Sequence, residues 1–300
     1  MYQLVAIGDV TVDMFFQGKG LTQDKERFQL AIGGKYYVDA FHHGLGGSAA
    51  NVSIHAAQLG LDCALVAPVG ENAFKNLIVQ TLARKTVSTE FLHFEREHIS
   101  VSSILLAPTG ERTIIKYSDP KQHIHLVDHA LERIKRSSII FMGNLHDVPL
   151  AERTQFMTSV RSETNLIALN LGAVDCEKGV AKVLPLLKTA DILFVNRFEC
   201  ASLLKKAPEK LDLSKNIFKE FGFDAKVIVV TDGAKGSYAY TAEEVYTQAP
   251  AKVTVVDATG AGDSFTASFL VTYSSAQNIQ EALADASAYA GKVISKIGAN

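Results

Sequence analysis

The chain has 300 residues, 47% of them hydrophobic, which is enough to bury a large core as one domain or as one domain carrying a smaller one. Its formal net charge of -2 gives no general attraction to nucleic acid or to an anionic membrane. The start of the chain lacks the basic region of a signal peptide, and no apolar run reaches membrane-spanning length. Cys63, Cys176 and Cys200 are too scattered for a disulfide framework or a C-x-x-C metal site. We therefore expect a cytoplasmic protein without nucleic-acid or membrane partners.

Short apolar runs alternate along the chain with helix-length amphipathic segments. The predicted strands are 2–7, 63–68, 138–142, 166–169, 191–195, 226–230 and 253–256, and the predicted helices are 49–59, 73–84, 126–136, 151–161, 199–205 and 213–221. This order predicts right-handed crossovers and a mostly parallel sheet with helices on both faces. Ligands of such sheets bind beyond the carboxyl ends of the strands.

Two segments interrupt the alternation. Residues 14–45 contain no convincing helix, while 101–107 and 112–118 flank the turn Pro108-Thr109-Gly110-Glu111 as in a hairpin. Together they predict a small antiparallel sheet inserted into the α/β core. The expected division is a core of 1–13, 46–98 and 119–300 and a lid of 14–45 and 99–118.

The most informative segment is Asp257-Ala258-Thr259-Gly260-Ala261-Gly262-Asp263, between the run 253–256 and a helix-like stretch from Ser264. The two glycines let backbone N–H groups turn inward, and the helix adds free N–H groups and the positive end of its dipole, so the turn suits an anion. Asp263 beside such a site is a candidate catalytic base, although the helix end would lower its pKa. The combination is typical of phosphoryl transfer.

Four further motifs occur in the order found in one known family. They are Gly8-Asp9 with Asp13, Gly46-Gly47-Ser48-Ala49-Ala50-Asn51, Asn196-Arg197-Phe198-Glu199 and Thr231-Asp232-Gly233-Ala234-Lys235-Gly236. With the segment 257–263 they resemble the motifs of the ribokinase-like (PfkB) carbohydrate and nucleoside kinases. The resemblance extends from residue 8 to residue 263 and so covers nearly the whole chain.

This resemblance implies a three-layer α/β/α sandwich with a β-sheet lid, and an ATP-dependent phosphotransferase that forms a homodimer through the lid. It implies that Asp263 is the base, with Gly260, Ala261 and Gly262 binding the transferred phosphoryl group. The resemblance also implies that the acceptor is bound by Asp13, Gly46, Gly47 and Asn51. It implies that the nucleotide is bound by Asn196, Glu199, Thr231, Gly233 and Gly236. Glu199 would hold Mg²⁺ through water, and Asp257 would lie near a monovalent cation such as K⁺.

Each of these residues also has a purely structural interpretation. Asp263 could be a favourable charge in a first helical turn, and Asp257 could fix the end of a strand. Asp13 could belong to a turn, Asn51 could cap a helix, and Asn196 with Glu199 could be an N-cap and a surface acid. Other nucleotide motifs are absent from the sequence: there is no G-x-x-x-x-G-K-[ST], and Phe265 occupies the third glycine position of a dinucleotide fingerprint.

The acceptor is the least determined feature. Residues 8–16 and 36–51 contain no Lys or Arg, and Lys35 and Arg112 are the nearest cations expected in the lid, so we expect a neutral acceptor rather than a phosphosugar. A monosaccharide is the first choice and a nucleoside the second, since lid side chains could stack on a base or form the lid's own core: Tyr36, Tyr37, Phe41, His42 and His43. A non-catalytic sugar-binding or regulatory relative is a further alternative. A metal site at His123, His125 and His129 is weaker than a solvated helix face.

Overall fold

The computed structural model describes residues 1–21, 23–24, 27–107, 112–119, 123–124, 126 and 128–300. Within these residues the main sheet has ten strands in the order β16-β15-β14-β13-β12-β11-β1-β6-β7, with β8 paired to β6. The strands are β1 (Leu4–Ile7), β6 (Cys63–Gly70), β7 (Val87–Ser88), β8 (Leu92–Glu95), β11 (Ile139–Met142), β12 (Leu166–Asn170), β13 (Ile192–Asn196), β14 (Val227–Thr231), β15 (Ser237–Tyr240) and β16 (Val245–Gln248). Every pairing is parallel except those of β15.

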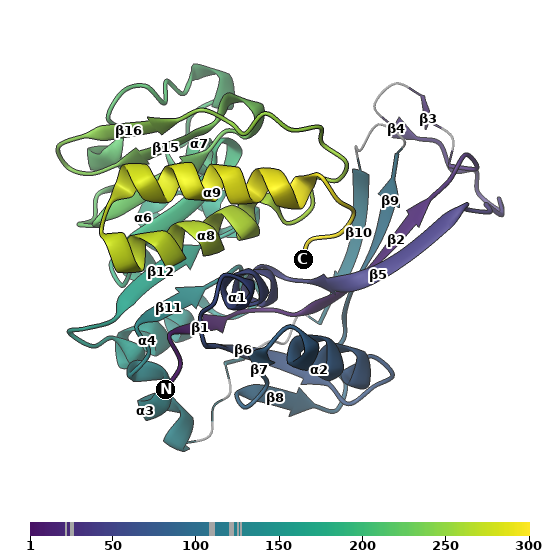
Figure 1. Ribbon diagram of the computed structural model, residues 1–300, viewed down its shortest axis with the longest axis horizontal. Coiled ribbons are helices and arrows are strands. Elements are labelled where there is room, and N and C mark those ends of the chain that lie inside the picture. The colour runs from purple at the N-terminus through teal and green to yellow at the C-terminus, as the bar shows by residue number, and fades with distance from the viewer. Residues whose placement is uncertain (22, 25–26, 108–111, 120–122, 125, 127) are drawn as a thin grey trace.

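Helices cover both faces of this sheet (Figure 1). One face packs against α1 (Ser48–Gln58), α2 (Lys75–Arg84), α8 (Ala261–Ala276) and α9 (Ile279–Ile294); the other packs against α3 (Asp128–Lys135), α4 (Leu150–Val160), α5 (Ala173–Cys176), α6 (Val180–Leu187) and α7 (Arg197–Leu203). In β1, Leu4 and Ala6 join the first layer, while Val5 and Ile7 join the second. Strands buried on both faces read as continuous apolar runs, which is why the sequence predicts them well.

A second sheet, the lid, extends from one side of the core (Figure 1). Its order is β10-β9-β2-β5, from β2 (Thr11–Gln17), β5 (Ala40–Gly46), β9 (Ser100–Leu106) and β10 (Arg112–Ser118), and a short hairpin of β3 (Gln23–Asp24) and β4 (Arg27–Phe28) lies nearby. The β10–β9 and β2–β5 pairings are antiparallel, whereas β2 and β9 are parallel. The division into core and lid units stays a prediction, and β2 begins inside the expected core segment. The turn 108–111 lies outside the described residues.

Two predicted elements are wrong. Residues 253–256 form no strand; the Val256 N–H bonds to the carbonyl of Ile294 in α9, and Val253 and Val255 are 40% and 48% exposed. Residues 213–221 form only a 3-10 turn, η2 (Phe218–Phe221). Leu213, Ile217 and Phe221 are buried at helical spacing, but irregular chain buries them equally well. Two further 3-10 turns are η1 (Pro208–Lys210) and η3 (Gly233–Lys235).

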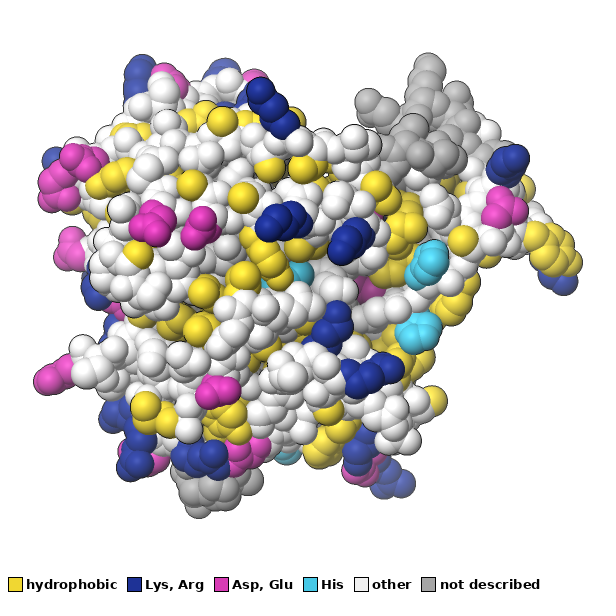
Figure 2. Space-filling view, viewed as in Figure 1, with side chains coloured by type: hydrophobic (Ala, Val, Ile, Leu, Met, Phe, Trp, Pro, Cys, Tyr) yellow, Lys and Arg dark blue, Asp and Glu magenta, His cyan; other side chains and the backbone are white. Residues whose placement is uncertain are grey.

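The outer surface carries mixed charges. Figure 2 shows acidic and basic side chains interspersed over one face, without a continuous basic area. Among the described residues no helix is both long and apolar enough to cross a membrane.

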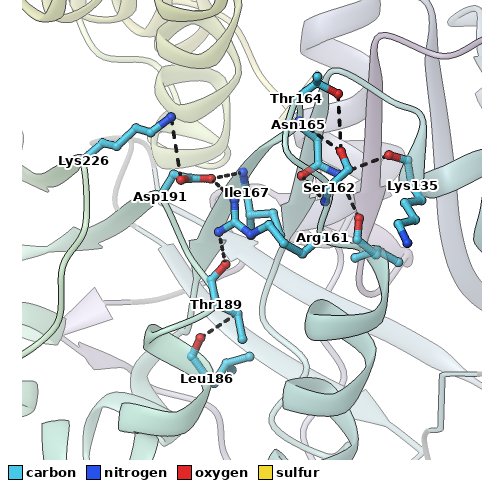
Figure 3. A network of polar contacts seen from close by, with 11 residues as sticks. Lys135, Arg161, Ser162, Thr164, Asn165, Ile167, Leu186, Thr189, Asp191 and Lys226 are labelled. Atoms are coloured by element: carbon cyan, nitrogen blue, oxygen red, sulfur yellow. Dashed lines mark hydrogen bonds and ion pairs between the residues drawn. The ribbon is translucent and has the colours of Figure 1, made fainter.

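A polar network fixes the amino ends of three neighbouring strands (Figure 3). Arg161 donates to Asp191 at 2.6 Å and to the Thr189 carbonyl at 2.6 Å, and Asp191 accepts from the Ile167 N–H at 2.7 Å. Lys226 lies 3.8 Å from the same carboxylate. These residues lie at the starts of β12, β13 and β14, the edge opposite the glycine motifs, so the network supports the fold rather than the site.

Candidate active site

The turn that leads into α8 has the geometry of an anion site. Gly260 is the N-cap, with a φ of 76° and no side-chain cap. A Cβ at Gly260 would lie 2.6 Å from the Ala299 carbonyl oxygen, so this position requires glycine. The N–H groups of Gly262 and Asp263 fall in the first helical turn, where no intrahelical acceptor exists. Gly262 has an ordinary φ and open space around its missing side chain, so the backbone freedom expected of both glycines is needed only at Gly260.

Asp263 lies in the first turn of α8, where Asn51 of α1 donates a hydrogen bond of 2.8 Å to its Oδ2. Burial raises the pKa of Asp263 to about 7; the bond from Asn51 opposes this, and the carboxylates of Asp9, Glu199 and Asp13 add to it. The net shift is therefore opposite in direction to the lowering expected from the helix end, and desolvation is its largest cause. A carboxylate with this pKa is a far better proton acceptor than an ordinary aspartate.

The glycine pair before α1 lets the acceptor motif approach Asp13. A Cβ at Gly46 would lie 2.1 Å from Asp13 Oδ2, and Gly47, with a φ of 93°, would place one 2.5 Å from the carbonyl oxygen of Asp9. Asp13 is only 6% exposed. Its burial raises its pKa to about 6, against the lowering effects of a Ser102 hydrogen bond and of the Lys116 charge.

Lys116 is a site residue that the sequence analysis missed. Its Nζ lies 2.7 Å from Asp9 Oδ2. Asp13 and Lys116 both lie opposite Ser102, across β2–β9 and β9–β10, so all three share one face of the lid. The cations named from the sequence were Lys35 and Arg112; Lys35 instead lies over the Tyr37 ring, 5.4 Å from its centroid. The sequence carried no signal for Lys116, because its place depends on the strand register.

Asn196 and Glu199 form a capping box at the start of α7. The Asn196 side chain accepts from the Glu199 N–H at 2.9 Å, and Glu199 Oε2 accepts from the Asn196 N–H at 2.9 Å. Burial raises the Glu199 pKa, and the Asn196 bond opposes it. Arg197, also missed, makes paired bonds of 2.7 and 2.6 Å to Asp232, between Thr231 and Gly233. Arg197 therefore ties α7 to the predicted nucleotide loop.

A cavity of about 460 Å³ adjoins this loop and the anion turn. Its lining joins the predicted nucleotide residues to the start of α8 and to an apolar wall: Thr231, Gly233, Gly236, Ala261, Gly262, Val253, Val255, Ala290, Gly291 and Ile294. Val253 and Val255 of the run 253–256 belong to this wall. The volume and the apolar lining are typical of a pocket for a small organic ligand.

Asp257 is fully buried and accepts three hydrogen bonds from the chain itself. Its Oδ1 accepts from the N–H and the hydroxyl of Thr259 at 2.9 and 2.6 Å, and its Oδ2 accepts from the Gly298 N–H at 2.9 Å. These three hydrogen bonds account for the burial of Asp257, although the described residues directly before it form no strand and the expectation that it fixes a strand end is wrong. Among the described residues no three His, Cys, Asp or Glu side chains form a metal-ligand group. An ion that keeps its waters and binds phosphate oxygens needs only one or two carboxylates, so Glu199 fits a magnesium ion held through water.

The lid aromatics divide between its two faces. Phe41 lies opposite Phe16 across β2–β5, and their rings are 5.4 Å apart. This is the face opposite Asp13, so Phe41 belongs to the lid's own packing. His42 lies opposite Phe15, on the same face as Asp13. Tyr36 and Tyr37 lie outside regular strands and are 36% and 75% exposed.

Known proteins resemble this chain along its whole length. The sequence profile described as pfkB family carbohydrate kinase matches residues 2–300. The chain is 27% identical over 239 residues to probable fructokinase-5 of Arabidopsis thaliana, covering 76% of this chain and 72% of that protein. The adenosine kinase structure from Sinorhizobium meliloti superposes with a TM-score of 0.81 at 21% identity, covering 100% and 95% of the two chains. Arabidopsis thaliana ribokinase complexed with ribose and ATP gives 0.79 at 23% identity, covering 99% and 94%.

These likenesses confirm the expected ribokinase-like α/β fold with its small additional sheet. They also confirm the expectation of a kinase that transfers a phosphoryl group to a hydroxyl acceptor. The chain belongs to the pfkB family of carbohydrate kinases.

Proposed function

We propose that this kinase transfers the γ-phosphoryl group of ATP to a hydroxyl group of a neutral monosaccharide, with Asp263 as the base. The observation that carries the proposal is the 2.8 Å hydrogen bond from Asn51 to Asp263, which joins the acceptor motif to the anion turn. Asp13, Asn51 and the backbone at Gly46 and Gly47 hold the acceptor. Asp9 Oδ1, which is buried without a hydrogen-bond partner among the described residues, is a further contact for a hydroxyl.

In the reaction, the acceptor oxygen bonds to the γ-phosphorus as the bond to the ADP oxygen breaks, and the hydroxyl proton passes to Asp263. The N–H groups of Gly260, Ala261 and Gly262 stabilise the transferred charge. Because the transition state is loose, the carboxylate mainly orients the hydroxyl until its oxygen has begun to bond.

The nucleotide lies in the 460 Å³ cavity, with Thr231, Gly233 and Gly236 at its phosphates. Asn196 and Glu199 would hold Mg²⁺ through water, and the ion would supply positive charge that neutralises the phosphates. A K⁺ ion near Asp257 is a separate proposal. Comparing turnover in K⁺ and in tetramethylammonium buffers tests it, because the larger cation cannot replace K⁺ in a protein site.

The charges of the site favour a neutral acceptor. Asp9, Asp13 and Asp263 are carboxylates, and Lys116 is already paired with Asp9. Arg112 lies four residues from Lys116 in β10, about 13 Å along the strand, so it does not lie beside the Asp9–Lys116 pair. A phosphosugar would meet uncompensated carboxylates. ADP release across fructose, ribose, fructose 6-phosphate and adenosine tests this: the highest kcat/KM with the phosphosugar would refute the proposal, and the highest with adenosine would support the nucleoside alternative.

The nucleoside alternative rests on His42, which strand register places on the same lid face as Asp13, opposite the buried Phe15. The alternative of a non-catalytic relative has less support, because the chain keeps both the anion turn and Asp263 at a raised pKa.

A cytoplasmic location stays a prediction, supported by three free, buried cysteines.

We also propose a homodimer through the lid face that points away from Asp13. Strand register places Met14 and Phe16 on this face together with Phe41, Ile115 and Tyr117, which are 52%, 60% and 58% exposed. A sheet face this apolar is typical of an interface. Sedimentation of the wild type and of Ile115→Lys tests the dimer; a monomeric wild type at micromolar concentration would exclude it.

A further inference from the structure

We infer that Asn300 is a positioning residue for Asp263 and that it acts through Asn51. The inference rests on the proposed role of Asp263 as the base. It concerns the segment 297–300, which follows α9 and ends where Figure 1 marks C, between α1 and the lid.

The contacts of Asn300 fix which way each amide group faces. Its Nδ2 donates to the Leu45 carbonyl oxygen at 2.8 Å and to Asn51 Oδ1 at 2.8 Å. A carbonyl oxygen can only accept, so the Asn300 amide nitrogen must face Leu45. That nitrogen then selects the oxygen of Asn51, which leaves Asn51 Nδ2 to donate to Asp263 Oδ2 at 2.8 Å. The orientation of Asn51 therefore follows from the hydrogen-bond series, although O and N of an amide are alike in shape.

The segment that carries Asn300 is attached to the site from both sides. His55, in the same helix as Asn51, lies with its Nε2 2.7 Å from the Ala299 carbonyl oxygen and its Nδ1 3.1 Å from the Tyr289 hydroxyl. Burial lowers the His55 pKa, so the neutral ring donates from Nε2 and accepts at Nδ1. The Gly298 N–H bonds to Asp257 at 2.9 Å, and Ala299 packs against Gly260. The elements that place Asp263 thus also place Asn300.

Ionised Asp263 can only accept, so it too holds the Asn51 nitrogen toward itself. Without Asn300, however, the Asn51 amide can turn when Asp263 is protonated, because the carboxylic acid O–H can then donate to Asn51 Oδ1. This bond stabilises the protonated form and replaces the donor bond that favours the ionised form. The other groups around Asp263 do not replace that donor. Asp9, Asp13 and Glu199 are carboxylates that raise its pKa, Lys116 is paired with Asp9, and His55 and Tyr289 bond to each other. The loss of Asn300 should therefore reduce the population of ionised, correctly directed Asp263.

Two substitutions test this with different chemistry. Asn300→Ala removes the donor, and Asn300→Asp replaces it with an acceptor of nearly the same shape. We expect kcat to fall about 10-fold in Asn300→Ala and further in Asn300→Asp, with the KM for ATP within about twofold of wild type. The acidic limb of the pH–rate profile should move to higher pH in both variants. The matched control is Asn278→Ala at the other end of α9, where the side chain only caps the helix through the Glu281 N–H; its kcat and pH profile should not change.

A double-mutant cycle separates action through Asn51 from a general effect on the fold. If Asn300 acts through Asn51, Asn300→Ala should lower kcat by less than about twofold when Asn51→Ala is already present. Additive losses, or an unchanged kcat and pH profile in both Asn300 variants, would overturn the inference. Asp263→Asn, measured alongside, separates failure of the proposed base from failure of the positioning role. Full activity in Asp263→Asn would refute Asp263 as the base. A large loss of activity in Asp263→Asn, with unaffected Asn300 variants, would refute only the positioning role of Asn300.

Discussion

The Lys116 ammonium group lies 2.7 Å from the carboxylate of Asp9 and so links the lid strand β10 to the loop after β1. Burial disfavours the charge of Lys116, but the attraction and hydrogen bond of Asp9 outweigh it and raise the Lys116 pKa. The same charge lowers the pKa of Asp13, which burial raises. The positive charge of Lys116, which comes from the lid strand β10, therefore reduces the electrostatic repulsion between the carboxylates of Asp9 and Asp13.

Lys116→Met should weaken acceptor binding more than it slows turnover. The change keeps the side-chain length but leaves Asp9, whose side chain is 9% exposed, without its partner. We expect the acceptor KM to rise about 10-fold, while kcat at saturation changes less than about threefold. Steady-state kinetics checks this, with Lys75→Met as the control, since Lys75 forms an exposed pair with Glu71. An unchanged acceptor KM would show that Lys116 plays no part in the site.

Asp263→Asn should lower kcat by at least about 10²-fold, because the amide keeps the shape of the side chain and loses its basicity. The thermal unfolding temperature should stay close to that of the wild type. Single-turnover measurement of phosphorylated acceptor gives the chemical step directly. Turnover within a few-fold of wild type would show that Asp263 is not the base.

The pH–rate profile should show an acidic limb near the raised pKa of Asp263, about 7. A base must be ionised, so kcat/KM should fall as the pH drops through this value, with a slope of about 1 on logarithmic axes. An unperturbed aspartate would place the limb near its usual pKa of about 4. A flat profile between those two values of pH would contradict the predicted shift, and the limb should disappear in Asp263→Asn.

Gly260 and Gly262 should respond differently to alanine. Gly260→Ala forces a side chain into a φ of 76° and to within 2.6 Å of the Ala299 carbonyl, so both turnover and the unfolding temperature should fall. Gly262→Ala should keep the fold, because space is open there.

Gly262→Val should reduce turnover, because the larger side chain enters the phosphate path, while the affinity for the acceptor stays intact. Calorimetry with the acceptor checks this, and equal loss of binding and turnover would make the loop purely structural.

The sequence alone predicted the parallel core and the anion turn because both depend on local chemistry. β1, β6 and β11 to β14 are continuous apolar runs that only a sheet buried on both faces explains. The turn at Gly260 needs a residue free to adopt positive φ, and Asp263 follows it in the first helical turn, so the order of residues already contains the geometry.

The tertiary structure decided which distant residues complete the site. Lys116 reaches Asp9 only because β10 pairs with β9 in one particular register. Asn300 reaches Asn51 only because the chain after α9 turns back toward α1. The run 253–256 has the composition of a strand, yet it lines a pocket, since apolar side chains are needed equally by a sheet core and by a ligand cavity. Composition and spacing show that a residue will be buried, but only the packing of distant segments determines what buries it.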